Sequence, residues 1–426
     1  MRPDGSLMMV NQQNQGNSSV EEFKARAKAW IQSNLPAEGS PEDVVMGGSD
    51  ETLRIALNRK LQRKIFDGGF AGIMYPKEVG GLGLTRAHQH AFLEAAHGYI
   101  LPSLFAVTHG ILGPTLLDFA SEEKQREFIP KMLSGEALWV QFLSEPSGGS
   151  DMAAARTRAT RDGDTYIING SKTWSTGAHF SDMALVLVRT DWDAPKHRGL
   201  SMIAIPIRTE GVQVRPIELA DGSADFAEEF FDDVVVPGAN LVGIESDGWT
   251  VASRLLFHER SMVGGNSYND NHLGTRRTGN PLEKSLALAT ERGSLSDPIV
   301  RQMIGELRMQ ELVKPNAVRT IDKAIRSGVI PGPGASLLKL MSSKMEFRGN
   351  EIIASISADG LIAEDLDTSG SLGRSWLISR ISTVAGGTTE MQLNQISERV
   401  LGLPREAAPD KGLPFSHATK LGTERK

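Results

Sequence analysis

Hydrophobic residues recur at helical spacing in the first part of the chain, at strand-like spacing in the middle, and at helical spacing again towards the end. The first helix is expected to begin after Ser19, because Ser19 and Glu22 have the spacing of a capping box. A second N-cap is expected at Ser121. Helical patterns then cover 53–66, 87–96 and 122–132, and later 251–264, 282–291, 300–313, 337–356 and 375–381.

The middle of the chain, from Trp139 to about Asn240, consists of short β-branched runs separated by Gly, Asp and Pro. These runs are 165–168, 183–188, 201–205, 212–214 and 234–236. Strands and helices do not alternate, which argues against a Rossmann-type arrangement. The pattern predicts an α+β fold with an N-terminal helical domain, a small antiparallel β-domain in the middle and a C-terminal helical bundle.

The same pattern predicts where the parts of the chain begin and end. They are a disordered leader at 1–18, an N-terminal helical domain at 19–138, a middle β-domain at 139–243, a C-terminal helical domain at 244–404 and a tail at 405–426. The tail mixes charges with Gly and Pro, so we expect it to be mobile or to wrap along the surface.

Composition narrows the class of protein. A net charge of −6 over 426 residues argues against a nucleic-acid binder, and the absence of cysteine excludes disulfides, thiol nucleophiles and Cys-ligated metals. There is no apolar run long enough for a membrane span, and the leader lacks the pattern of a targeting segment. A cytoplasmic protein is the default expectation. Glu94 and His97 form half of a di-iron motif whose second half is missing, so no metal site is expected.

Two segments carry the candidate chemistry. In 141–151, QFLSEPSGGSD, an apolar run gives way to small hydroxyl and glycine residues, which allow backbone N–H groups to approach a flat, polar, anionic cofactor. The segment 169–176, NGSKTWST, adds a tryptophan that can cover a ring system and hydroxyls that can bond its edge. Together they favour a flavin site.

These motifs resemble those of the acyl-CoA dehydrogenases over about residues 20 to 405. The resemblance is carried by 144–151, 169–174, 386–391 and 397–405. It implies bound FAD, an acyl-CoA substrate, and α,β-dehydrogenation to a trans-2-enoyl-CoA with hydride transfer to flavin N5. It also implies that electrons pass to an electron-transfer flavoprotein, and that a homotetramer or dimer forms in which two subunits touch each FAD.

Carried over by position, the resemblance implies FAD contacts at Gln141, Leu143, Ser144, Gly149, Ser150, Trp174, Ser175, Thr176, Arg292, Ser294, Thr388 and Glu390. Trp174 is expected against the ring, with Ser175 and Thr176 near N5. Arg292 is expected at the pyrophosphate of the FAD bound by the partner subunit. Ser150 is also expected near the substrate pantetheine. The plainer alternatives are a core aromatic for Trp174 and a solvated helix charge for Arg292.

The catalytic base is expected at an unusual position. Many family members place a glutamate directly before Gly-Thr in the C-terminal motif, where this chain has Gly386. Another branch, which includes isovaleryl- and long-chain-type enzymes, places it on the first helix after the β-domain, directly before an arginine. Here that pair is Glu259-Arg260. Glu259 is therefore the candidate base, and Arg260 a candidate orienting or CoA-facing cation. The alternative is a charge pair on a helix surface.

Two other functions remain open from the residues alone. An acyl-CoA oxidase would share the fold, and a non-catalytic subunit of a heteromeric dehydrogenase would share part of the site. The acyl group's length, branching or ring content depends on residues far apart in sequence. Contacts to the adenine side of FAD are equally open, with Ser357-Ala358 the best match.

Overall fold

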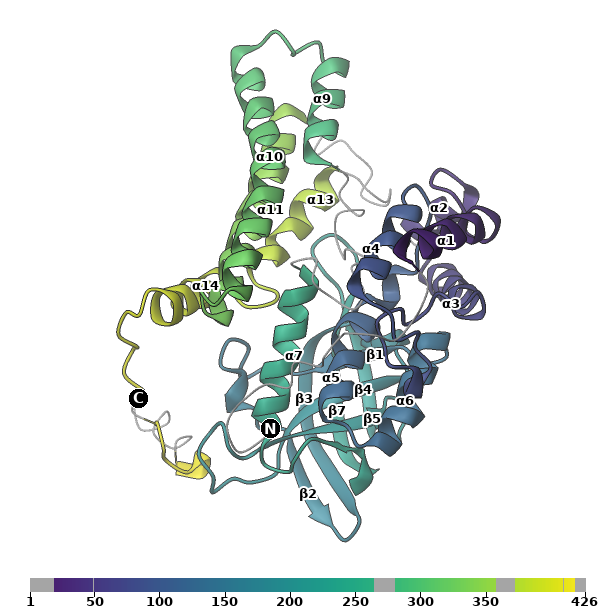
Figure 1. Ribbon diagram of the computed structural model, residues 1–426. Coiled ribbons are helices and arrows are strands. Elements are labelled where there is room, and N and C mark those ends of the chain that lie inside the picture. Colours follow the sequence, from purple (N-terminus) through teal and green to yellow (C-terminus); the bar gives the residue numbers. More distant parts are fainter. Residues whose placement is uncertain (1–18, 49, 264–279, 358–371, 409, 418–426) are drawn as a thin grey trace.

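The computed structural model describes residues 19–48, 50–263, 280–357, 372–408 and 410–417. The expected leader at 1–18 lies outside the described residues, as does Ala358. Figure 1 shows three parts in sequence order: helices, then a sheet, then helices that extend away from the sheet. The predicted order of helical, β and helical regions is confirmed.

The N-terminal helices pack into one layer beside the sheet (Figure 1). Phe23 of the first helix is fully buried, and the capping box between Ser19 and Glu22 is confirmed. Ser121 also caps its helix, accepting a hydrogen bond from the backbone N–H of Lys124. The elements are α1 (Val20–Asn34), α2 (Pro41–Gly47), α3 (Glu51–Asp67), α4 (Arg86–Ala95), the π-helical η3 (Thr108–Leu112), α5 (Gly113–Phe119) and α6 (Glu122–Ser134).

The middle sheet has the strand order β6-β7-β3-β2-β4-β5-β8, with β1 added on β4. Its pairings are antiparallel as expected, except that β1 and β2 each run parallel to β4. The exceptions arise because the β2–β3 hairpin reverses the chain before β4 begins. The strands are β1 (Trp139–Phe142), β2 (Arg158–Asp162), β3 (Thr165–Thr176), β4 (Met183–Arg189), β5 (Leu200–Pro206), β6 (Val212–Ile217), β7 (Phe226–Pro237) and β8 (Leu241–Val242).

Strand β3 is longer than the pattern predicted. The sequence indicated a strand only at 165–168, whereas β3 continues for 12 residues through the whole motif at 169–176. Its pairing with β7 shifts register between Ile168 and Gly170 and again between Thr173 and Ser175. Trp174 is the extra residue at the second shift and has a φ of 67°. Such a bulge changes which side chains face outward.

The C-terminal helices begin with α7 (Gly248–Val263), which packs on the sheet and on the N-terminal helices through Val251, Ala252 and Leu255. The others are α9 (Pro281–Glu291), α10 (Pro298–Arg326), α11 (Ala335–Ser357), α13 (Leu372–Ile378) and α14 (Thr389–Gln395). Helices α9, α10 and α11 form an arm that projects from the rest of the chain (Figure 1). None of the described helices is both long and apolar enough to span a bilayer.

Helix α10 also exceeds its predicted length. The apolar spacing indicated 300–313, but the helix runs for 29 residues and contains Pro315. Of its apolar side chains, Leu307 is buried, while Met309, Leu312 and Val313 are exposed within this single chain. Exposed apolar residues three and four apart form a stripe on one helix face, which is typical of a surface that a partner covers.

Candidate active site

The loop 143–151 is fastened to β3 by a buried ion pair. Lys172, from the middle of β3, is fully buried and donates to Glu145 at 2.9 Å and to the carbonyl of Leu143 at 3.0 Å. Glu145 also accepts the backbone N–H groups of Arg156 and Thr157. Burial alone would raise the pKa of Glu145, but the Lys172 ammonium and these N–H groups hold it below its ordinary value. The loop is therefore held in one position relative to β3.

The outward face of β3 presents the side chains expected to meet a cofactor. Trp174 has 57% of its surface exposed, and Thr176 is exposed two residues later on the same face. Ser175 lies between them and points inward, where its hydroxyl donates to the buried carboxyl of Glu229 at 3.0 Å. Ser175 was expected near flavin N5, but its hydroxyl faces the sheet interior, so only its backbone remains available there. We call the loop 143–151 with Trp174 and Thr176 the β3 wall.

The β3 wall has features that suit a flat, polar cofactor. A side chain added at Gly149 would meet no atom within 4 Å, so the backbone there is open to close approach. Ser150 is exposed and Ser144 half-buried, which leaves both hydroxyls accessible. Beside the wall, the side-chain oxygen of Gln141 is buried and has no partner among the described residues. A large exposed aromatic, open glycine backbone and hydroxyls together fit a flavin.

The carboxylate of Glu259 lies beside Gly386, the position at which the motif of many acyl-CoA dehydrogenases has a glutamate. A Cβ placed on Gly386 would be 3.1 Å from the Glu259 Oε1 and 3.4 Å from the Cε of Lys339. The side-chain amide of Gln141 donates to the other carboxylate oxygen of Glu259 at 3.1 Å. Residues from β1, α7, α11 and the turn before α14 thus meet around one carboxylate. We call Gln141, Glu259, Lys339 and Gly386 the base site.

The orientation of α7 explains how Glu259 reaches this position. His258 and Arg254 point to a different side of the helix and both bind Asp118 of α5, at 2.9 and 2.7 Å. That contact fixes the helix rotation, since neighbouring positions on a helix point about 100° apart. Arg260 is half-buried beside Glu259, and burial lowers the pKa of its guanidinium while the Glu259 charge opposes that shift.

Lys339 was not identified from the sequence. Its ammonium donates to the carbonyl of Ser382 at 2.6 Å and to the hydroxyl of Ser343 at 2.9 Å. Burial lowers the pKa of Lys339, and the charges of Glu346 and Glu259 offset part of that shift. No local motif marks this lysine, because it acquires its surroundings only when α11 packs near α7. Lys172 and Glu145 could have been recognised, since a lysine inside an apolar strand requires a buried acid.

The remaining expected FAD contacts come from the C-terminal helices. Arg292 is exposed and is the C-cap of α9, whose connection to α10 forms the tip of the arm in Figure 1. Ser294 follows it and its hydroxyl donates to the carbonyl of Ala289. Thr388 caps α14 by accepting the N–H of Met391, and Glu390 is exposed in the first turn of that helix. Figure 1 shows the tip of the arm well away from strand β3, which carries Trp174.

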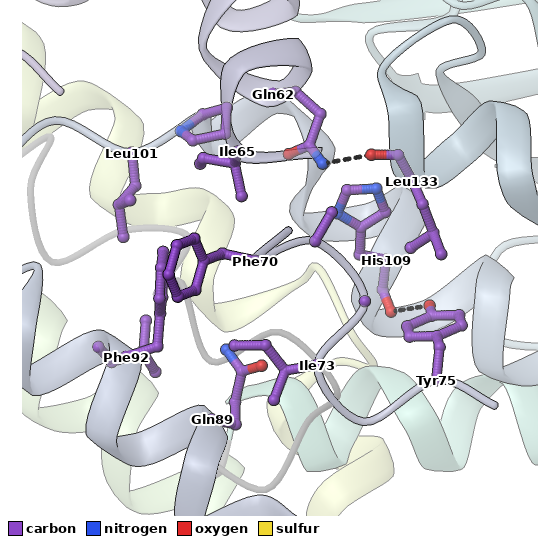
Figure 2. A pocket seen from close by; sticks show the side chains of 14 residues that line it. Gln62, Ile65, Phe70, Ile73, Tyr75, Gln89, Phe92, Leu101, His109 and Leu133 are labelled. Atoms are coloured by element: carbon purple, nitrogen blue, oxygen red, sulfur yellow. Dashed lines mark hydrogen bonds between the residues drawn. The ribbon is translucent and has the colours of Figure 1, made fainter. Parts of the chain in front are cut away.

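A separate cavity of about 40 Å³ lies among the N-terminal helices (Figure 2). Gln62 donates to the carbonyl of Leu133, and Tyr75 donates to the carbonyl of His109 at 2.6 Å. Burial lowers the pKa of His109 to about 4, so its imidazole is neutral at neutral pH. The volume suits a few water molecules and not an acyl chain. Nor do the described residues contain a cluster of His, Cys, Asp or Glu able to hold a metal ion.

The chain is similar to known proteins over most of its length. The sequence matches the acyl-CoA dehydrogenase N-terminal domain over 44–136, the middle domain over 141–234 and the C-terminal domain over 246–401. It is 34% identical to acyl-CoA dehydrogenase IpdE1 of Mycobacterium tuberculosis, across 91% of this chain and 99% of that relative.

Solved structures share the fold. A "Tcur3481-Tcur3483 steroid ACAD" superimposes with a TM-score of 0.73 at 27% identity, covering 92% of this chain and 99% of that one. The ChsE4-ChsE5 complex from Mycobacterium tuberculosis gives a TM-score of 0.68 at 24% identity, covering 92% and 100%. The matches extend through all three regions of the chain. It therefore belongs to the acyl-CoA dehydrogenase family, whose members are flavin-dependent oxidoreductases.

Proposed function

We propose that this protein catalyses FAD-dependent α,β-dehydrogenation of an acyl-CoA thioester to the trans-2-enoyl-CoA, with Glu259 as the base. The observation that carries the proposal is the Glu259 carboxylate, which lies 3.1 Å from the position of a Cβ on Gly386. Gly386 is where other family members are expected to have their catalytic glutamate. A carboxylate reaching that space from α7 can serve the same reacting carbon.

Each residue of the base site then has a role in proton removal. Glu259 accepts the α-proton of the thioester, a weak acid that requires a positioned base. Gln141 orients the carboxylate by donating to the oxygen that does not face Gly386. Lys339 holds the turn that contains Gly386 through its bond to Ser382. When bound, FAD supplies the acceptor for the hydride that leaves the β-carbon.

The β3 wall is the proposed binding surface for the flavin ring. Trp174 would cover the ring, Thr176 would bond its edge, and the hydroxyl and backbone of Ser144 would meet its pyrimidine side. The open backbone at Gly149 and the hydroxyl of Ser150 would adjoin the cofactor and the pantetheine arm. These assignments are supported by the exposure of Trp174 and by the rigid attachment of the loop through Lys172.

A second subunit would complete the cofactor site. Arg292 and Ser294 lie at the tip of the arm, so we propose that they reach the FAD of a partner, with Thr388 and Glu390 as further contacts. The exposed stripe on α10 supports assembly into a homotetramer or dimer. Electrons would pass to an electron-transfer flavoprotein.

A heteromeric enzyme is a second candidate, in which this chain would form one of two subunits. The names of two structural relatives, the Tcur3481-Tcur3483 steroid ACAD and the ChsE4-ChsE5 complex, support it. Such a chain purified alone would be colourless or inactive. Recovery of FAD and activity on co-expression with a second family member would favour the heteromer.

The decisive experiment is Glu259→Gln, with Glu123→Gln at an exposed position on α6 as the control. Both proteins would be mixed without oxygen with straight-chain, branched and ring-bearing acyl-CoA thioesters, and flavin bleaching would be recorded. We expect Glu259→Gln to keep its FAD but to bleach about 10²- to 10⁴-fold more slowly, the usual contribution of a general base. Bleaching at the wild-type rate would refute the assignment. The fastest thioester would identify the substrate class.

A further inference from the structure

The end of the chain returns to the middle domain after an exposed connection. Residues 401–408 are all exposed, whereas Phe415 has only 2% of its surface accessible. The backbone N–H of Phe415 donates to the carbonyl of Ala194 at 3.0 Å, and that of Ser416 donates to the carbonyl of Trp192 at 2.9 Å. The segment 410–417 is thereby attached to the connection between β4 and β5.

The side chain of Phe415 contacts the buried guanidinium of Arg189, which in turn binds a segment that is distant in sequence, 153–155. Its ring centre lies 3.6 Å from the guanidinium carbon of Arg189 and 5.5 Å from the ring of Trp192. Arg189 is fully buried and donates to the carbonyls of Ala155 at 3.0 Å and Ala153 at 2.7 Å. Stacking on an aromatic face restrains a guanidinium without using its N–H donors. The tail therefore restrains the group that holds 153–155.

An ion-pair network forms a second link between the tail and the same turn. The ammonium of Lys196 lies 3.1 Å from a carboxylate oxygen of Asp151 and 3.1 Å from one of Asp410. Asp151 ends the loop of the β3 wall and directly follows Ser150, while Asp410 belongs to the tail. An aromatic contact and an ionic contact thus connect residues 410–417 to the two ends of the turn 151–155.

We propose that residues 410–417 are a C-terminal clip that holds the turn 151–155, and with it the preceding Gly149 and Ser150, in place beside the acyl-CoA site, with Phe415 as its anchor. The inference rests on the proposed function, because the turn adjoins substrate only if Gly149 and Ser150 meet the pantetheine arm. Arg189 and Lys196 transmit the contact, and no residue of the clip touches the reacting atoms. Phe415 and Asp410 are therefore positioning residues.

The alternation of side chains within the clip provides a matched control. Leu413 is 38% exposed and lies two residues from the buried Phe415 in the same segment. Phe415→Ala and Leu413→Ala both remove an apolar side chain from the clip, but only the first removes the contact with Arg189. Asp410→Asn leaves the aromatic contact intact and weakens the ionic link alone.

The test compares these full-length proteins with FAD bound. In Phe415→Ala we expect amide hydrogen exchange in 149–157 to become at least about fivefold faster, because opening requires fewer contacts to break. The KM for acyl-CoA should rise about tenfold, while kcat and FAD content stay within about twofold. Asp410→Asn should change exchange and KM in the same direction by about two- to threefold. Leu413→Ala should match the wild type.

The clip would be overturned if amide exchange in 149–157 were unchanged in Phe415→Ala. It would also be overturned if Leu413→Ala accelerated that exchange as much as Phe415→Ala does. If Phe415→Ala does not fold, Asp410→Asn decides, and unchanged exchange in that variant overturns the clip as well. Hydrogen exchange requires no turnover. A wild type that oxidises no acyl-CoA, either alone or co-expressed with a second family member, would therefore refute the proposed function, while the exchange result would still decide the clip.

Discussion

The β3 wall and the base site differ in how far apart their residues lie along the chain. The β3 wall is built from a loop and a strand that lie close in sequence, joined by the pair of Lys172 and Glu145. The base site combines β1, α7, α11 and the turn before α14, so its residues meet only after the C-terminal helices have packed against the sheet. A local site can be recognised as a motif, whereas a dispersed site is specified by helix orientation.

The two regions also differ in how their buried charged side chains are paired. Behind the β3 wall, Lys172 is fully buried and its charge is matched by a carboxylate that accepts further hydrogen bonds. In the base site, Glu259 is half-buried and bonded by a neutral amide, with a cation nearby. A fully paired charge serves structure, whereas the Glu259 carboxylate is held by an amide on one oxygen and turns its other oxygen towards Gly386. Three substitutions test this contrast.

The largest effect is expected for Lys172→Met in the β3 wall. Removing one partner of a buried ion pair leaves Glu145 without its counter-charge, which typically costs about 3–5 kcal/mol. We expect a free energy of unfolding lower by that amount and loss of bound FAD, measured by urea denaturation and flavin absorbance. Lys60→Met, at an exposed position on α3, is the control. Unchanged stability and flavin content would show that the pair is not what holds the loop.

A pH-dependent effect is expected at Glu229, behind the same wall. Burial raises the pKa of Glu229 to about 8 from 4.5, with the Ser175 hydroxyl and Lys172 opposing part of that shift. The folded protein then retains a proton that the unfolded chain releases, so stability falls as pH rises from about 4.5 through about 8. A shift of this size corresponds to on the order of 5 kcal/mol.

The glutamine side chain of Glu229→Gln cannot ionise, so this variant should not lose stability in that way as the pH rises. We expect the variant and the wild type to unfold at similar temperatures near pH 5, and the variant to unfold at a higher temperature near pH 9. Thermal unfolding followed by circular dichroism across this range measures the difference. Parallel curves for the two proteins would mean that Glu229 titrates normally.

The smallest effect is expected for Lys339→Met in the base site. Loss of its bond to Ser382 frees the turn containing Gly386 beside Glu259, and we expect kcat to fall about tenfold with little change in stability or FAD content. Lys339→Arg should recover part of the rate. Lys344→Met, exposed on the same helix, is the control. Equal values of kcat in Lys339→Met and Lys344→Met would show that Lys339 has no role in the base site.

Much of the fold could be predicted because apolar spacing reports which face of an element is buried. The capping box at Ser19 and the order of helical and β regions are examples. The length of α10 could not be predicted, because its continuation through Pro315 leaves little apolar surface buried within one chain. The inward orientation of the Ser175 side chain was also not predicted, since a bulge at Trp174 changes the alternation that a regular strand would follow.

By itself, the sequence determined the class of fold, the resemblance to acyl-CoA dehydrogenases and the candidates Trp174, Thr176 and Glu259, because each depends on residue type or on spacing over a few turns. Only the tertiary structure brought Glu259 beside Gly386, placed Lys339 next to both, and docked Phe415 on Arg189. Such contacts join segments far apart along the chain. Their geometry depends on how whole helices pack, which local periodicity does not encode.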